Sequence, residues 1–186
     1  MKSYFKVFIF IFLVFTVSCS ALRPAFKGEV VEPAVAAPEI GMADHNGNMF
    51  KLSDERGKVA LVFFGFTNCV DECPLTLAHF KLALEALGND AGQVQVVMVS
   101  TDPVRDTPQA LRDFMGKFNT TFIGIPGTVD ELSKLWNAYG VTVLDGGETH
   151  SGFTYVVDKQ GRLRLHFDPE MAPEDIAADL KVLLSE

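Results

Sequence analysis

Residues 59–74 read Val-Ala-Leu-Val-Phe-Phe-Gly-Phe-Thr-Asn-Cys-Val-Asp-Glu-Cys-Pro, and this stretch decides the fold. The apolar run 59–64 predicts a strand, and the segment 75–87 predicts a helix. Cys69 and Cys73 therefore lie between a strand end and a helix start, where unpaired N–H groups and partial positive charge favour thiolate over thiol. Three residues separate the thiols, one more than in the C-x-x-C motif of thioredoxin-type oxidoreductases. The position and spacing indicate a reactive pair.

Predicted strands and helices alternate on both sides of this stretch. Upstream, Asn46-Gly47 predicts a tight turn between two short strands, which gives an N-terminal β-hairpin at 40–52. Downstream, apolar runs bounded by turn residues predict strands at 94–99, 121–125, 153–157 and 163–167, and helices at 106–118, 129–139 and 173–184. This order indicates an α/β fold with a central mixed sheet flanked by helices.

The first 18 residues have the pattern of a signal peptide. Lys2 and Lys6 lie before an apolar run at 7–17. This run is shorter than the ~20 residues needed to span a membrane as a helix. The run ends before Cys19 in a sequence similar to the lipobox of bacterial lipoproteins. We therefore expect cleavage before Cys19 and lipidation of its thiol. The alternative is an uncleaved anchor helix, and both place the domain outside the cytoplasmic membrane, on the periplasmic side of a bacterial envelope.

The remaining chain divides into two predicted parts. Residues 19–39 are rich in Ala, Pro and Val without a clear period, and we expect them to form a flexible tether. Residues 40–186 are expected to form one globular domain. The net charge of -8 and the lack of a basic run exclude nucleic acid as a main partner, because phosphate binding needs clustered Lys and Arg.

Three states of the Cys69/Cys73 pair are compatible with the sequence: a disulfide, a metal site, or two packed and inert thiols. Buried inert cysteine is common in proteins. Here, however, Asn68, Asp71 and Glu72 surround the pair with polar groups at a strand–helix junction. These neighbours favour a functional site over inert packing.

His150 is the candidate third ligand. It lies in the polar loop 146–152, directly before the strand at 153–157, whereas His45, His79 and His166 have the positions of surface or packing residues. Two thiolates and one imidazole suit copper(I), which prefers soft donors and tolerates low coordination. Zinc with a bound water is the alternative, but the sequence offers no obvious fourth ligand or general base.

A second polar segment, residues 102–108, follows the buried strand at 94–99. Asp106 or Thr107 is expected to cap the next helix, with Pro108 in its first turn and Gln109 completing a capping box. This interpretation leaves Asp102 unexplained. We expect Asp71, Asp102 and Asp106 to support the metal site from positions beside it. For Asp102, a contact with a partner protein is the alternative.

Taken together, these residues resemble the Sco/SenC family of copper chaperones, which serve cytochrome c oxidase assembly. The resemblance covers the chain from about Ile40 to the C-terminus. The motifs that carry it are Phe64-Gly65-Phe66-Thr67-Asn68-Cys69, the C-x-x-x-C-Pro at 69–74, Asp102-x-x-x-Asp106-Thr107, and His150-Ser151 followed by 153–158.

The resemblance implies a thioredoxin-like fold in which Cys69, Cys73 and His150 hold copper(I) or copper(II). It further implies delivery of copper to the binuclear centre of cytochrome c oxidase subunit II, or to another copper-accepting protein, or reduction of that centre's cysteines. The sequence departs from the family pattern at three places: Val70 stands where Pro is usual, Glu72 where Val is usual, and Glu148-Thr149 where Val-Asp is usual. The three ligand positions are unchanged.

The alternative function is a thiol-disulfide reductase that acts through the redox-active pair Cys69 and Cys73. Thioredoxins place a proline immediately before the strand that faces the dithiol, but residues 148–153 contain His150 and no proline. This difference favours metal binding. A thiol peroxidase ranks lowest, because no Arg lies near the dithiol in the sequence.

Overall fold

The computed structural model describes residues 25–144, 149–150 and 152–186, with backbone only at 149–150. A six-stranded mixed sheet runs through the centre in the order β1-β10-β9-β4-β5-β6. Its strands are β1 (Glu29–Ala36), β4 (Val59–Gly65), β5 (Val94–Ser100), β6 (Ile123–Ile125), β9 (Thr154–Val157) and β10 (Arg162–Phe167). Strands β4, β5 and β6 are parallel, and β9 runs antiparallel to β4.

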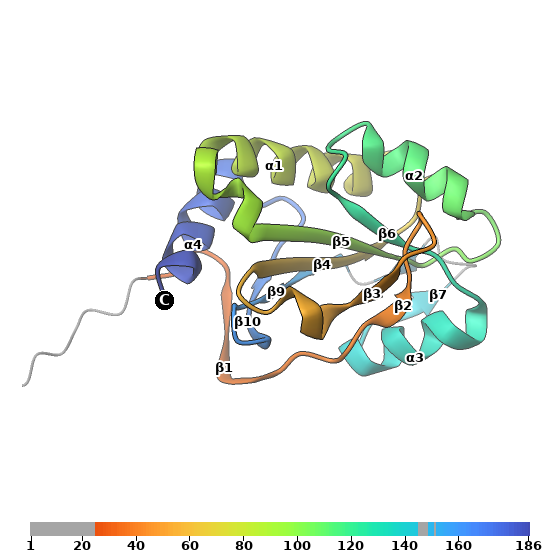
Figure 1. Cartoon of the computed structure of the whole chain (residues 1–186), viewed down its shortest axis with the longest axis horizontal. Helices are drawn as coiled ribbons and strands as arrows, with labels where there is room; N and C mark the ends of the chain where they lie inside the picture. The colour runs from red at the N-terminus through yellow and green to blue at the C-terminus, as the bar shows by residue number, and fades with distance from the viewer. Residues whose placement is uncertain (1–24, 145–148, 151) are drawn as a thin grey trace, which may run out of the picture.

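Four α-helices cover the two faces of this sheet (Figure 1). They are α1 (Glu72–Leu87), α2 (Pro108–Gly116), α3 (Val129–Tyr139) and α4 (Pro173–Ser185). Two short 3₁₀ helices, η1 (Leu52–Glu55) and η2 (Gly88–Gln93), connect other elements. Two small two-stranded sheets lie outside the main one: β2 (Gly41–Ala43) with β3 (Met49–Lys51), and β7 (Val143–Leu144) with β8 (Thr149–His150).

Strand β4 is the centre of the core because it is buried on both faces. Its alternate side chains pack into two separate clusters. Leu61 and Phe63 face the helices α1, α2 and α4, whereas Val62 and Phe64 face α3 and the β2–β3 hairpin. A continuous apolar run such as 59–64 is the pattern expected for a strand covered on both sides. The predicted α/β class and the predicted hairpin are both confirmed.

The segment predicted to be a tether contains strand β1, and this part of the prediction was wrong. β1 pairs antiparallel with β10, with Glu29 opposite His166 and Val35 opposite Leu163. Just before it, the buried carboxylate of Asp179 on α4 accepts hydrogen bonds from the backbone N–H groups of Lys27 and Gly28 at 2.8–3.0 Å. Proline is tolerated in β1 because the strand lies at the sheet edge and its register shifts midway.

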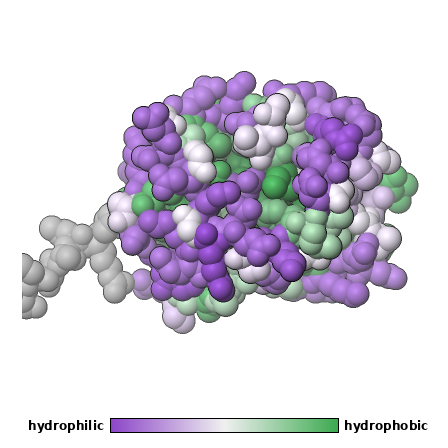
Figure 2. All heavy atoms as spheres, viewed as in Figure 1, coloured by the Kyte–Doolittle hydropathy of each residue, from purple (hydrophilic) through white to green (hydrophobic). Residues whose placement is uncertain are grey.

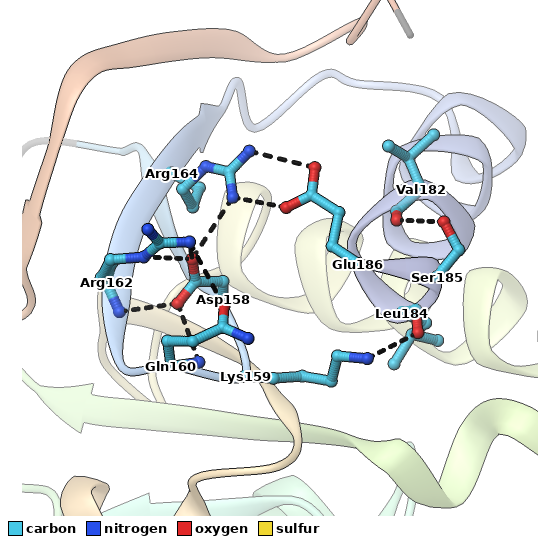
Figure 3. A network of polar contacts seen from close by, with 9 residues as sticks. All are labelled: Asp158, Lys159, Gln160, Arg162, Arg164, Val182, Leu184, Ser185 and Glu186. Carbon is cyan, nitrogen blue, oxygen red and sulfur yellow. Dashed lines mark hydrogen bonds and ion pairs between the residues drawn. The ribbon is translucent and has the colours of Figure 1, made fainter. Parts of the chain in front are cut away.

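The C-terminus is tied to the β9–β10 turn by a polar network (Figure 3). The buried carboxylate of Asp158 accepts hydrogen bonds from the backbone N–H groups of Gln160 and Arg162 and from the Arg162 side chain. The guanidinium of Arg164 bridges Asp158 and Glu186. The network fixes the end of α4 against the sheet. No helix within the described part of the chain is long and apolar enough to cross a membrane.

Candidate metal and dithiol site

The dithiol lies where predicted, in the connection between β4 and α1. Gly65 ends β4, and Cys73 lies in the first turn of α1. The Cys73 sulfur occupies the space that a side chain at residue 65 would need: an ideal Cβ on Gly65 would lie 2.8 Å from Cys73 Sγ and 3.0 Å from a ring carbon of Phe63. Glycine at 65 therefore allows Cys73 to enter the core, where it is 2% exposed.

The two cysteines are free thiols with different environments. Cys69 is half-buried and Cys73 is buried. The backbone N–H of Cys73 donates to Cys69 Sγ at 3.4 Å, so the outer sulfur lies at the N-terminus of α1, where negative charge is favoured. Burial raises the pKa of the Cys73 thiol, and the neighbouring Cys69 and Glu72 act in the same direction. The pair thus combines an accessible sulfur with a protected one.

Asp106 holds the dithiol loop in place through Thr67, a contact that the sequence did not reveal. Its carboxylate accepts hydrogen bonds from Thr67 N–H at 3.0 Å and Thr67 Oγ1 at 2.7 Å, and from Ser100 Oγ at 2.6 Å. Burial raises the pKa of Asp106, against the opposing effect of these hydrogen bonds. Thr107 is the N-cap of α2, since its Oγ1 accepts from Ala110 N–H. Asp106 is therefore a support for residues 66–68 and not the cap.

Asp102 and Arg105 form a second support on the same loop. The buried carboxylate of Asp102 pairs with the Arg105 guanidinium, which lies 5.9 Å over the ring of Phe66. An arginine therefore lies close to the dithiol loop in space, although none does in sequence. Asp71, by contrast, is exposed directly before α1 and makes no side-chain capping bond among the described residues.

The side chain of His150 lies outside the described residues, and the same holds for residues 1–24 with Cys19. The backbone of His150 is described: it pairs with Val143 in the β7–β8 ribbon. Two residues later, a Cβ on Gly152 would lie 2.8 Å from Pro169 and 3.6 Å from the Glu72 carboxylate. The end of the His150 loop therefore lies beside the start of α1. Within the described side chains, no cluster of three or more His, Cys, Asp or Glu residues could hold a metal ion.

The other three histidines have packing environments. His45 is buried and its Nδ1 accepts the Gly124 N–H at 2.9 Å, while burial lowers its pKa. His79 Nδ1 lies 3.0 Å from the Met171 carbonyl oxygen. The ring of His166 contacts the ring of Tyr155 at 5.1 Å between centroids. These contacts agree with the packing roles expected from their positions in the sequence.

Comparison with known proteins places this arrangement in a family. The family model described as SCO1/SenC matches residues 32–185. The chain belongs to the SCO1/SenC family. A SCO2-like protein of Rickettsia felis is 30% identical to it over 149 residues, which are 75% of this chain and 73% of that protein.

Two solved Sco structures have the same fold. ScoI of Bradyrhizobium japonicum, in a structure with copper bound, is 32% identical with a TM-score of 0.73, and the match covers 81% of this chain and 100% of that one. Apo Sco1 of Thermus thermophilus is 33% identical with a TM-score of 0.77, over 88% of this chain and 99% of that one. The resemblance to the Sco family and the thioredoxin-like fold are thereby confirmed.

Proposed function

We propose that this Sco protein is a copper chaperone of the bacterial cell envelope. Cys69, Cys73 and His150 bind copper and deliver it to the binuclear centre of cytochrome c oxidase subunit II, or reduce the cysteines of that centre. A lipid on Cys19 anchors the protein on the periplasmic side of the membrane. The copper-bound structure of the Bradyrhizobium japonicum relative supports the choice of metal.

One observation carries the proposal: the two free sulfurs and the end of the His150 loop both lie at the start of α1. Cys69 Sγ contacts the Cys73 N–H, and Gly152 lies beside Glu72, the residue directly before Cys73. This position of the loop supports the proposal that His150 joins the two thiols as a copper ligand. Two thiolates and one imidazole form a soft donor set that suits copper(I).

The different burial of the two thiols indicates an order for copper transfer. Cys69 is the accessible sulfur, so an incoming thiolate of the acceptor displaces it first. Cys73 is enclosed by core side chains and releases the ion last. Copper keeps its oxidation state during this ligand exchange, and each displaced thiolate takes up a proton as metal binding is lost.

The test is copper binding by the purified, reduced protein. We expect one copper(I) per chain, and essentially none in the double variant Cys69→Ser, Cys73→Ser. His150→Ala should weaken the retention of copper(II), whereas the matched variant His79→Ala, which removes a packing histidine on α1, should not. Equal copper(II) retention in His150→Ala and wild type would reject His150 as the third ligand.

Reductase activity is the second candidate, favoured by the contact between Cys73 N–H and Cys69 Sγ. The Cys69 thiolate attacks a partner disulfide, forming a mixed disulfide and releasing one partner thiolate. Cys73 then loses its proton and attacks Cys69 Sγ, which releases the second thiolate and leaves a Cys69–Cys73 disulfide. The partner gains two electrons and the pair loses two. Rapid insulin reduction without stoichiometric copper binding would favour this function.

The lipid anchor has a separate test. Labelling of growing cells with a radioactive fatty acid should mark the protein, and Cys19→Ser should abolish the label. A labelled Cys19→Ser variant would contradict lipidation at this residue.

A further inference from the structure

Two strongly exposed apolar side chains lie on the loop that carries Cys69 and on the loop packed against it. Val70 and Val104 are 86% and 84% exposed, the highest values for large apolar residues in the described part of the chain. Val70 lies between the two cysteines, and Val104 lies between the buried carboxylates Asp102 and Asp106.

The two valines lie on loops that are bonded to each other. Thr101 N–H donates to the Gly65 carbonyl oxygen at 2.8 Å, and Asp106 accepts two hydrogen bonds from Thr67. The Arg105 guanidinium lies over the ring of Phe66. These contacts hold the Val104 loop against the loop that carries Cys69 and Val70. The two valines therefore belong to a rim of adjoining loops that includes Cys69.

A groove continues this rim away from the cysteines. It has a volume of about 580 Å³ and lies between the β2–β3 hairpin, the loop before α2 and the start of α3. Met42, Met49, Pro103 and Pro126 supply its apolar lining, and Pro103 directly precedes Val104. Met49 is 64% exposed. Methionine side chains adapt to different shapes, which is why they are common on surfaces that bind other proteins.

Charge indicates which kind of protein fits this surface. Asp71 and Glu72 are exposed next to Val70, and Glu131 lines the groove. The chain as a whole carries 24 acidic and 16 basic side chains. On the face seen in Figure 2, hydrophilic residues predominate and apolar ones form separate patches. An apolar strip with acidic neighbours is complementary to a partner whose contact surface is apolar with basic side chains.

We propose that Val70, Val104 and this groove form the docking surface for the protein that exchanges copper or a disulfide with Cys69. The occupant is a folded domain that presents its own pair of cysteines. Beside them, an apolar side chain of the partner enters the groove, and basic side chains of the partner face Asp71 and Glu72. This inference rests on the proposed function, because docking here places the partner's thiols directly against Cys69.

The test separates docking from metal binding. The variant Val104→Lys, Met49→Lys introduces two positive charges on the surface, which repel a basic partner, without changing a proposed ligand. Val35→Lys introduces the same charge at a 49% exposed valine on β1 as control. The probe is the soluble copper domain of cytochrome c oxidase subunit II. We expect the double variant to bind this domain at least tenfold more weakly by calorimetry, in the copper-free state, and to transfer copper(I) to it correspondingly more slowly. Val35→Lys should match wild type.

Removal of copper(I) by the small chelator bathocuproine disulfonate, which needs no docking, should proceed at the wild-type rate in all three proteins. Unchanged affinity for the domain in the double variant would overturn the docking surface. So would an equal slowing of transfer to the domain and to the chelator, because that result locates the defect in the metal site. Failure of wild type to bind copper would instead reject the proposed function, and the calorimetry on copper-free protein would still decide whether this surface docks the domain.

Discussion

Replacing Gly65 by alanine is expected to disturb the dithiol directly. The added methyl group would lie 2.8 Å from Cys73 Sγ and 3.0 Å from a ring carbon of Phe63. Non-bonded heavy atoms at optimal separation lie about 3.5–4.0 Å apart, so the sulfur or the strand must move by roughly 0.7 Å. Neither can move freely, because β4 is paired on both sides by β5 and β9 and Cys73 is enclosed by the core.

The magnitude follows from two opposing effects. Overpacking a core costs about 1–3 kcal/mol, whereas exchanging Gly for Ala restricts the unfolded chain and stabilises by about 0.4–1 kcal/mol. We therefore expect Gly65→Ala to lower the free energy of unfolding by about 1–2 kcal/mol and Tm by several degrees. If the displaced sulfur no longer meets copper in the right position, copper(I) affinity should fall about tenfold, which corresponds to roughly 1.4 kcal/mol.

The assay is urea unfolding of the reduced, metal-free protein, followed by copper(I) competition with a chelator. Gly41→Ala is the matched control, because this strand glycine has no atom within 4 Å of an added Cβ. We expect the control to be more stable than wild type by about 0.4–1 kcal/mol and to keep the wild-type copper affinity. If Gly65→Ala matched the control in both measurements, the argument that Gly65 positions Cys73 would be wrong.

Three further substitutions test the supporting contacts. Burial alone would raise the pKa of Asp158, but hydrogen bonds from Arg162 and its positive charge outweigh burial and lower the pKa. The ionised Asp158 carboxylate therefore stabilises the folded state fully above its unfolded pKa of ~4. This stabilisation is lost as the pH falls through the lower folded pKa. Asp158→Asn should thus lower the free energy of unfolding at pH 7 by about 1.5–3 kcal/mol and have a smaller effect at pH 2, as measured by urea unfolding. Asp106→Ala should speed copper release to a chelator, because Thr67 loses its acceptor; wild-type release would contradict the support role. Asp179→Ala should expose the bond after Lys27 to trypsin, and undiminished resistance would show that other contacts hold this segment.

The sequence was sufficient to predict the order of the main elements from β2 to α4, but not the short β7–β8 ribbon, which lies partly in the segment predicted to be a loop. Strand β4 is a continuous apolar run, helix α3 has a clear amphipathic pattern, and the turn around Gly47 is a local signal. The dithiol position followed from these elements, since both cysteines lie at a strand–helix junction that local patterns define.

What the sequence did not predict depends on contacts between distant residues. Strand β1 has no clear alternation, and its position depends on Asp179, more than 150 positions away. Asp106 has the residue type of a helix cap, and only the packing of two loops shows that it binds Thr67 instead. The role of Gly65 is equally hidden, because the absence of a side chain gives no pattern in a sequence. The convergence of His150 with the two sulfurs stays a prediction.

If Cys19 carries the lipid, the attachment of Lys27 to α4 limits how far the domain can lie from the membrane. Only eight residues (19–26) would then link the lipid to the domain, whereas a tether reaching residue 39 would supply twenty-one. Fully extended, eight residues span about 28 Å, and as a flexible coil they average about 16 Å. The domain would then stay within about 28 Å of the lipid surface. Acceptors whose cysteines lie close to the lipid surface would be within reach, whereas acceptors whose cysteines lie far from the membrane would not.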